Sequence, residues 1–326
     1  MSTSLLPKAV TFAIIGSFSF ASYCVSGELI HESRMYNEFS DSVTSDTVDT
    51  STKHYLSSSI SYGNNSSFLG RFQSQRMPYL GADVTVMHKK GFWFSTMAYD
   101  IPSSPEFIDE IDIMAGWSFD INKKWDGSVY YGRYFYNENA ELLKSYVANS
   151  ASVTAGFDWS ILYTRLGSVY IFGNDIRDIF LTLDNSHYFE FPGFLGGDYL
   201  SIDPQISLIA GTQSFYEQFI IEEEIPGKKG KGKGKDKGKG KGKGKGKGPG
   251  NSPPPKAETK VTIIENEKRT FNLMSCELSL PVMYSRGNWS FETSGRYSIP
   301  VNALEGYPTA PQFFFSSTVY YTIGFK

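Results

Sequence analysis

The chain has almost no cysteine. Cys24 and Cys276 are the only two among its 326 residues, and Cys24 falls in an N-terminal segment that we expect to be removed, so no intrachain disulfide is predicted. The four histidines are scattered without metal-ligand spacing, so we predict neither a metal site nor a cofactor. After the N-terminus the chain also lacks the run of about 18 apolar residues that a membrane helix requires.

The first 27 residues have the composition of an export signal. Lys8 precedes an apolar stretch rich in small residues, and Gly27 fits the small-residue rule for cleavage before Glu28. An anchoring transmembrane helix is the weaker alternative, because the apolar run is short and contains several serines. A lipoprotein is disfavoured because a bulky tyrosine precedes Cys24. We therefore expect residues 1–27 to be a cleaved signal peptide.

Residues 28–51 are acidic, rich in serine and threonine, and without periodicity, so we expect a flexible periplasmic lead-in. A plug or a partner-docking segment is the alternative. The whole chain is 16% aromatic, yet its mean hydropathy is only -0.28. This combination suits a membrane β-barrel, in which only alternate residues of each strand meet lipid.

The last stretch, residues 311–326, alternates in the manner of such a strand. From Phe313 to Phe325 the odd positions are mainly aromatic or β-branched, and the even positions are mainly polar or small. Successive side chains of a strand point to opposite faces, so one face is apolar and the other mostly polar. The aromatic end resembles the closing strand of Gram-negative outer-membrane β-barrels, although Lys326 follows it. The resemblance implies recognition by the barrel assembly machinery, whereas a strand of a soluble β-sandwich is the alternative.

Twelve strands are predicted in all, and the connections between them alternate between tight turns and longer links. In a soluble β-sandwich, nothing requires the short connections to lie at one end of the strands and the long ones at the other. A membrane barrel, in contrast, has short periplasmic turns and long outer loops. We therefore predict that residues 52–326 form one all-β domain, a transmembrane up-and-down antiparallel β-barrel with both termini in the periplasm. The predicted strands lie near residues 54–63, 79–88, 91–101, 108–121, 125–137, 146–159, 162–173, 178–191, 199–213, 271–285, 288–302 and 312–326.

Charged residues opposite the apolar stripes are expected to line the lumen. An excess of acids there predicts a preference for cations in an open lumen, unless the arginines pair with acids and brace a closed barrel. The register of the seventh strand is ambiguous because of Val169 and Ile171, and Val147 is assigned to the apolar face of the sixth strand. The expected lumen residues are Asp83, Glu110, Asp112, Asp120, Arg133, Asp158, Arg165, Asp184, Glu190, Asp203, Glu277, Glu292 and Arg296.

Residues 222–260 interrupt the barrel with a lysine-glycine arm. Residues 228–247 hold 11 lysines and one aspartate, and removing these from totals of 31 and 34 leaves 20 basic against 33 acidic residues. Glycine and like-charge repulsion oppose packing, so we expect a disordered extracellular loop. It would bind polyanions such as lipopolysaccharide, acidic polysaccharide or extracellular DNA; a tolerated low-complexity expansion is the alternative. The lysines concerned are Lys228, Lys229, Lys231, Lys233, Lys235, Lys237, Lys239, Lys241, Lys243, Lys245 and Lys247.

No catalytic site is predicted, because Ser186 and His187 are adjacent in a strand and cannot pair as nucleophile and base. Residues 79–137 include YLGADVTVMHKKGFWF, EIDIMAGW and DGSVYYGRYFYN, and this stretch is similar to porins of the TorF type. The resemblance implies a small-solute channel. We therefore expect a protein of the bacterial outer membrane, in contact with its lipids, that passes small solutes or ions. The alternative is a non-conducting barrel that displays the basic arm.

Overall fold

The computed structural model describes residues 54–73, 75–137, 147–173, 176–212, 214, 270–303 and 308–325. The expected signal peptide, the lead-in and the lysine-glycine arm lie outside the described residues and stay predictions. The strands are β1 (His54–Gly63), β2 (Tyr79–Met87), β3 (Phe92–Asp100), β4 (Glu110–Asn122), β5 (Trp125–Tyr136), β6 (Asn149–Asp158), β7 (Tyr163–Phe172), β8 (Arg177–Ser186), β9 (Phe189–Pro192), β10 (Tyr199–Ile202), β11 (Gln205–Gly211), β12 (Asn272–Arg286), β13 (Trp289–Pro300) and β14 (Gln312–Phe325). A short 3-10 helix, η3 (Phe194–Gly196), connects β9 to β10.

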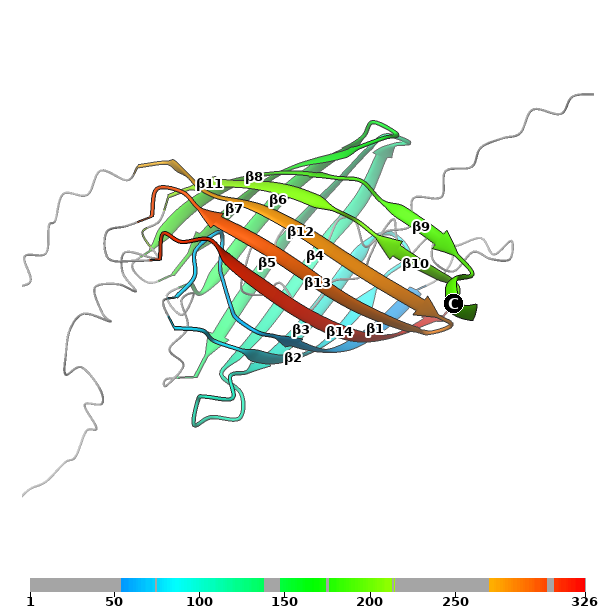
Figure 1. Cartoon of the computed structure of the whole chain (residues 1–326), viewed down its shortest axis with the longest axis horizontal. Coiled ribbons are helices and arrows are strands. Elements are labelled where there is room, and N and C mark those ends of the chain that lie inside the picture. The colour runs from blue at the N-terminus through cyan, green and yellow to red at the C-terminus, as the bar shows by residue number, and fades with distance from the viewer. Residues whose placement is uncertain are drawn as a thin grey trace, which may run out of the picture.

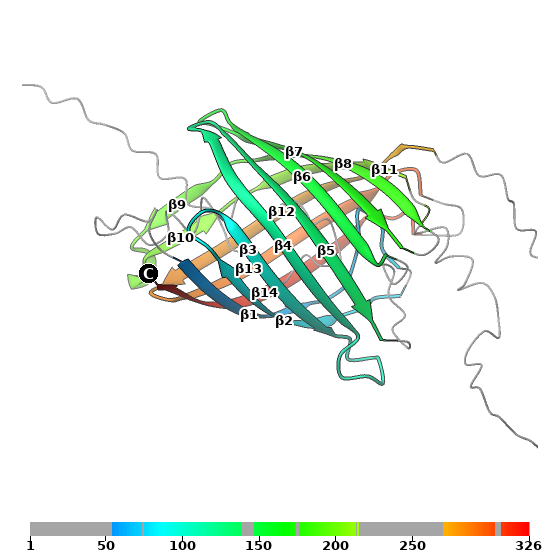
Figure 2. The ribbon, with the colours of Figure 1, turned by 180° about the vertical axis from the view of Figure 1, so that it is seen from behind.

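These strands form one antiparallel sheet that closes on itself (Figure 1). The first and last strands are neighbours, and His54 of β1 lies opposite Phe325 of β14. Figure 2 shows the opposite wall, where β4 to β8 run side by side. Because β9 continues β8 and β10 leads into β11, the 14 strand segments make a barrel of 12 strands. The predicted all-β barrel is confirmed.

Two predicted strands are each divided into two segments at the same level of the wall. The predicted strand 178–191 is divided between Ser186 and Phe189, and the strand 199–213 is divided at Pro204. Proline has no backbone N–H and cannot donate a ladder hydrogen bond. Its carbonyl still accepts a bond from the N–H of His187. The interruption therefore lies where the ladder loses a donor.

The two ends of the barrel differ in the length of their connections. The turn end holds the start of β1, the end of β14 and the short connections 88–91, 123–124, 159–162, 193–198 and 287–288. The loop end holds the connections 64–78, 101–109, 137–148, 173–176, 212–271 and 301–311. The predicted separation of connection lengths is therefore correct with two exceptions, because the connection 193–198 at the turn end has six residues and the connection 173–176 at the loop end has only four. Within the described residues, no helix is long and apolar enough to cross a membrane.

Side chains alternate between a buried inner face and an exposed outer face. In β2 every residue follows this alternation: Asp83 and Thr85 are buried, whereas Val84 and Val86 are exposed. In β14 the odd positions from Phe313 to Val319 are exposed, as the sequence predicted. The exposed face is mostly apolar and the inner face mostly polar. This is the reverse of a water-soluble protein, and it fits a barrel whose outer face meets lipid.

Aromatic rings gather on the outer face near both ends. At the turn end they make contacts between neighbouring strands. The rings of Phe92 and Trp117 stack with centroids 5.7 Å apart, and those of Trp289 and Tyr321 are tilted with centroids 4.8 Å apart. The exposed aromatic residues toward the loop end include Tyr62, Tyr131, Phe135, Tyr170, Phe271, Tyr297, Phe313 and Phe315. Two aromatic belts that flank an aliphatic band are typical of barrels that span a bilayer.

Candidate functional site in the lumen

The interior of the barrel is strongly acidic. Ten acidic side chains are buried, against three arginines, and among the described residues no lysine is buried. Of the residues predicted to line the lumen, Asp83, Glu110, Asp112, Arg165, Asp184, Asp203, Glu277, Glu292 and Arg296 are buried on the inner face. Asp109, Asp126, Asp178 and Arg71 are also buried and were missed, because they lie at strand ends or in a loop where alternation gives no signal.

Four predicted lumen residues lie elsewhere. Arg133 is exposed on the outer face of β5, where it bonds Asn149 at 2.8 Å and lies over the Phe135 ring. Tyrosines occupy both faces of this strand, so polarity did not reveal its register. Asp120 is exposed at the turn end of β4, and Asp158 accepts the backbone N–H of Ser160 within the next turn. Glu190 is half-buried at the turn end and accepts the Tyr188 hydroxyl at 3.3 Å.

One wall of the lumen carries a network of opposite charges. Nη1 of Arg296 on β13 lies 3.2 Å from Oε2 of Glu277 on β12, and Ser298 donates to the same carboxylate at 2.9 Å. Arg165 lies directly opposite Asp184 on the neighbouring strand. Asp184 and Glu277 lie near enough for their like charges to repel each other. Two arginines therefore offset part of the acidic charge on the wall from β7 to β13.

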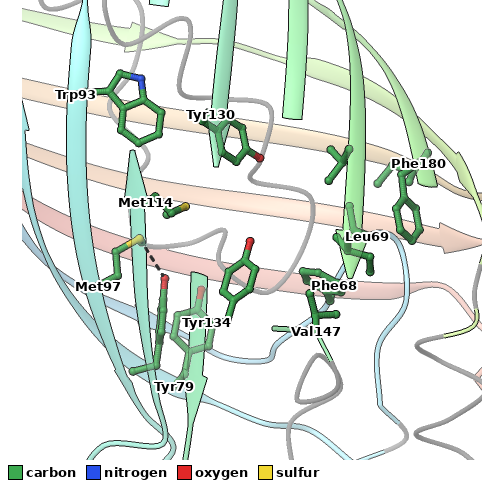
Figure 3. Close-up of a cluster of buried hydrophobic side chains, with 14 of the residues drawn as sticks. Phe68, Leu69, Tyr79, Trp93, Met97, Met114, Tyr130, Tyr134, Val147 and Phe180 are labelled. Atoms are coloured by element: carbon green, nitrogen blue, oxygen red, sulfur yellow. Dashed lines mark hydrogen bonds between the residues drawn. The ribbon is translucent and has the colours of Figure 1, made fainter. Parts of the chain in front are cut away.

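The wall from β2 to β5 is filled by aromatic and methionine side chains. Figure 3 shows Trp93, Met97, Met114 and Tyr130 projecting from this wall into the interior, and each is at most 6% exposed. The rings of Trp93 and Tyr130 are 6.0 Å apart. The other four tryptophans are exposed on the outer face. The acids on this wall therefore share the lumen with bulky apolar groups that narrow it.

The connection 64–78, called here the inner loop, folds into the barrel instead of extending away from it. Its residues 68–71 form a tight turn, in which the N–H of Phe68 donates to the carbonyl of Arg71 at 2.7 Å and the reverse bond is 2.9 Å. Leu69 and Gly70 at the tip have φ angles of 46° and 77°. Phe68, Leu69 and Phe72 are almost completely buried. The loop end of the lumen is therefore occupied by apolar groups.

Two arginines attach the inner loop to the barrel wall. The guanidinium of Arg71 donates to the carbonyls of Met274, Val301 and Asn302 at 2.8, 3.1 and 3.0 Å. From the wall, Nη2 of Arg296 donates to the Ser67 hydroxyl at 2.7 Å. The Arg71 acceptors lie at the loop ends of β12 and β13. The inner loop is thereby fixed to the wall that carries the charge network.

The tip of the inner loop belongs to an apolar cluster on the wall that carries the charge network, across the lumen from β2 and β3. Figure 3 shows Phe68 and Leu69 close to Val147 and Phe180. The surrounding apolar residues, called here the seat, are Val147, Val169, Ile171, Phe180, Ile209 and Met274, all at most 2% exposed. The ambiguous register of the seventh strand is explained, because Val169 and Ile171 do face the lumen. Val147 is buried in the seat, so its predicted place on the outer face was wrong.

The interior offers no arrangement suited to metal binding or to a Ser-His pair in the part of the chain that is described. No group of three or more His, Cys, Asp or Glu side chains there could hold a metal ion. Ser186 is buried on the inner face, whereas His187 bonds the carbonyl of Ile161 through its ring.

No protein-family model matches the sequence, and no curated protein sequence matches it. Among solved structures, the chain is similar to the KdgM porin (9% identity, TM-score 0.43, covering 81% of this chain and 98% of that one). It is also similar to the NanC porin (10% identity, TM-score 0.42, covering 82% of this chain and 98% of that one). A bacterial polysaccharide outer membrane secretin is similar as well (10% identity, TM-score 0.43, covering 84% of this chain and 99% of that one). At these values the likeness does not extend to function. None of these comparisons supports the TorF resemblance.

Proposed function

We propose that this protein is a β-barrel of the bacterial outer membrane. The apolar band between two aromatic belts supports this, because such a surface is stable in lipid and aggregates in water. Closure of the sheet supports it as well, since an open sheet edge in lipid would leave backbone groups without partners. We also propose a transport role rather than catalysis.

Within that membrane, we propose that the barrel is a narrow channel for small cations or cationic solutes. The observation that carries this proposal is the interior excess of ten buried acids over three arginines. Carboxylates inside a low-dielectric wall focus a negative potential along the axis, which attracts cations and repels anions. The bulky side chains of Trp93, Met97 and Tyr130 restrict the passage to small solutes.

The direct test is the reversal potential of the purified chain in planar bilayers under a potassium chloride gradient. We expect cation selectivity, and we expect a reduction when Asp83→Asn and Glu292→Gln are combined, since both acids are buried inside the barrel. Asp120→Asn, at an exposed position at the turn end, is the matched control and should change selectivity less. Anion selectivity that persists after deletion of residues 228–247 would contradict the proposal. Absence of any conductance, with the inner loop removed, would favour a braced and closed barrel.

A second candidate function is the binding of anionic polymers by the lysine-glycine arm. The specific observation is the separation of charge, because residues 228–247 carry +10 while the rest of the chain carries -13 (11 − 1 against 20 − 33). Retention of the purified chain on immobilised lipopolysaccharide or DNA, at rising salt, tests it. Deletion of residues 228–247 should abolish retention, and unchanged retention would exclude the arm as the binding segment.

A further inference from the structure

We propose that the inner loop is a gate, which closes the loop end of the lumen here and opens when its tip leaves the seat. This inference rests on the proposed channel function, because a gate has meaning only if the barrel conducts. The structural basis is threefold: a strained turn at the tip, an attachment made mainly by side chains, and an apolar receiving surface in a lumen that is otherwise polar.

The tip has an unfavourable backbone conformation. Leu69 has a φ of 46°, a left-handed conformation that a leucine rarely adopts because its Cβ crowds the following carbonyl. Gly70 accepts the same region without strain, and a side chain at this position would collide with Ser275. Asparagine would suit the turn better than leucine at position 69. The leucine is explained by its full burial in the seat, so the tip is shaped for packing there.

The attachment of the loop can be released without breaking the barrel. At the base of the loop, the Asn64 N–H donates to the carbonyl of Phe315 at 3.0 Å, and the Phe315 N–H donates to Oδ1 of Asn64 at 2.8 Å. The bridge between Phe68 and Arg71 is internal to the loop. Further in, side chains attach the loop to the wall, through Arg71, through the bond from Arg296 to Ser67 and through the bond from Asn65 to Gln312 at 3.1 Å. The loop can therefore swing about Asn64 while every strand ladder remains intact.

The receiving surface is unusual for its position. Inner faces of small barrels are usually lined by polar residues where water enters, yet the seat is entirely apolar. Removal of Leu69 from the seat exposes apolar area to water, which is unfavourable. The closed position is therefore favoured at rest. Weakening either the apolar contact or the Arg71 attachment should shift the population toward the open state.

Two variants and a control test the gate by single-channel recording. Leu69→Asn preserves the turn but removes the apolar contact, and Arg71→Ala removes the donor to three carbonyls. We expect each to raise the open probability at least about tenfold, and both together to raise it further. Phe107→Asn is the matched control, because Phe107 is 85% exposed in another connection at the loop end. It should leave the open probability unchanged.

Thiol accessibility gives a second measurement that does not depend on conductance. In a background with Cys24→Ser and Cys276→Ser, Leu69→Cys should react with a charged methanethiosulfonate at least tenfold more slowly than Phe107→Cys. Adding Arg71→Ala should accelerate its reaction. Rapid labelling of Leu69→Cys with Arg71 intact would overturn the gate, and so would slow labelling that Arg71→Ala does not change. Acceleration by Arg71→Ala without conductance in any variant would contradict the channel function while leaving the movement of the loop established.

Discussion

Arg296 and Glu277 form a buried ion pair across β12 and β13, with Nη1 of the guanidinium 3.2 Å from Oε2 of the carboxylate. The same guanidinium reaches Ser67 of the inner loop and lies over the ring of Phe314, 4.5 Å from its centroid. One side chain therefore joins the wall charges to the loop that fills the lumen. The pair joins neighbouring strands, so it does not span the lumen as the predicted brace would.

Breaking this pair should destabilise the barrel. Arg296→Ala leaves the Glu277 carboxylate buried with its charge uncompensated, which costs about 3 kcal/mol of unfolding free energy. The double variant with Glu277→Gln should lose less, because no uncompensated charge remains. Urea unfolding in liposomes measures both values. Arg286→Ala, at an exposed position of β12, is the control. An equal loss in Arg296→Ala and in the double variant would show that the uncompensated carboxylate does not destabilise the barrel.

The outer face should not tolerate charge. Leu280 is 49% exposed on the outer face of β12, in the aliphatic band. Leu280→Arg should destabilise the barrel folded in lipid by about 2–4 kcal/mol. Phe107→Arg, in a connection outside the strands, should cost less than about 1 kcal/mol. Folding yields and urea midpoints in liposomes test this, and an equal effect at both positions would argue against a lipid-facing band.

Much of this fold follows from alternation alone. A period of two, repeated in twelve segments with alternating turn lengths, predicts a closed barrel and the facing of strands such as β14. The prediction failed where polarity did not distinguish the faces. In β5, tyrosines on both sides concealed the outward position of Arg133. In β7 the register stayed ambiguous, because Val169 and Ile171 are apolar although they face the lumen.

The inner loop was beyond prediction for a different reason. Residues 64–78 are a short connection without the two-residue alternation of a strand, and such a connection normally extends into solvent. Its position depends on contacts with residues more than 200 positions away, such as the Arg71 bond to the Met274 carbonyl. The apolar residues on the lumen faces of the strands were the signal that an apolar segment, here the inner loop, fills the lumen. That signal could be interpreted only once the register was known.

Closure of the barrel should depend on its last strand. Residues 321–325 of β14 pair with residues 54–58 of β1 in a continuous ladder, and the His54 and Phe325 rings stack with centroids 5.5 Å apart. Deleting residues 321–326 leaves a sheet edge whose backbone groups lipid cannot satisfy. We expect loss of membrane-inserted, heat-modifiable protein, measured by gel shift before and after boiling. Normal insertion of the truncated chain would show that this pairing is dispensable.

The lysine-glycine arm should be accessible from outside the cell and dispensable for folding. It connects β11 to β12 at the loop end, whereas the strands begin and finish at the turn end, so a barrel with periplasmic termini places the arm outside. Trypsin added to intact cells should cleave within residues 228–247 and leave the barrel heat-modifiable, because a long surface connection adds little to stability. Lys89, Lys90, Lys123 and Lys124 lie in turns at the other end, and they provide an internal control. They should be protected until the outer membrane is permeabilised. Cleavage at these lysines in intact cells, with the arm protected, would reverse the orientation of the barrel.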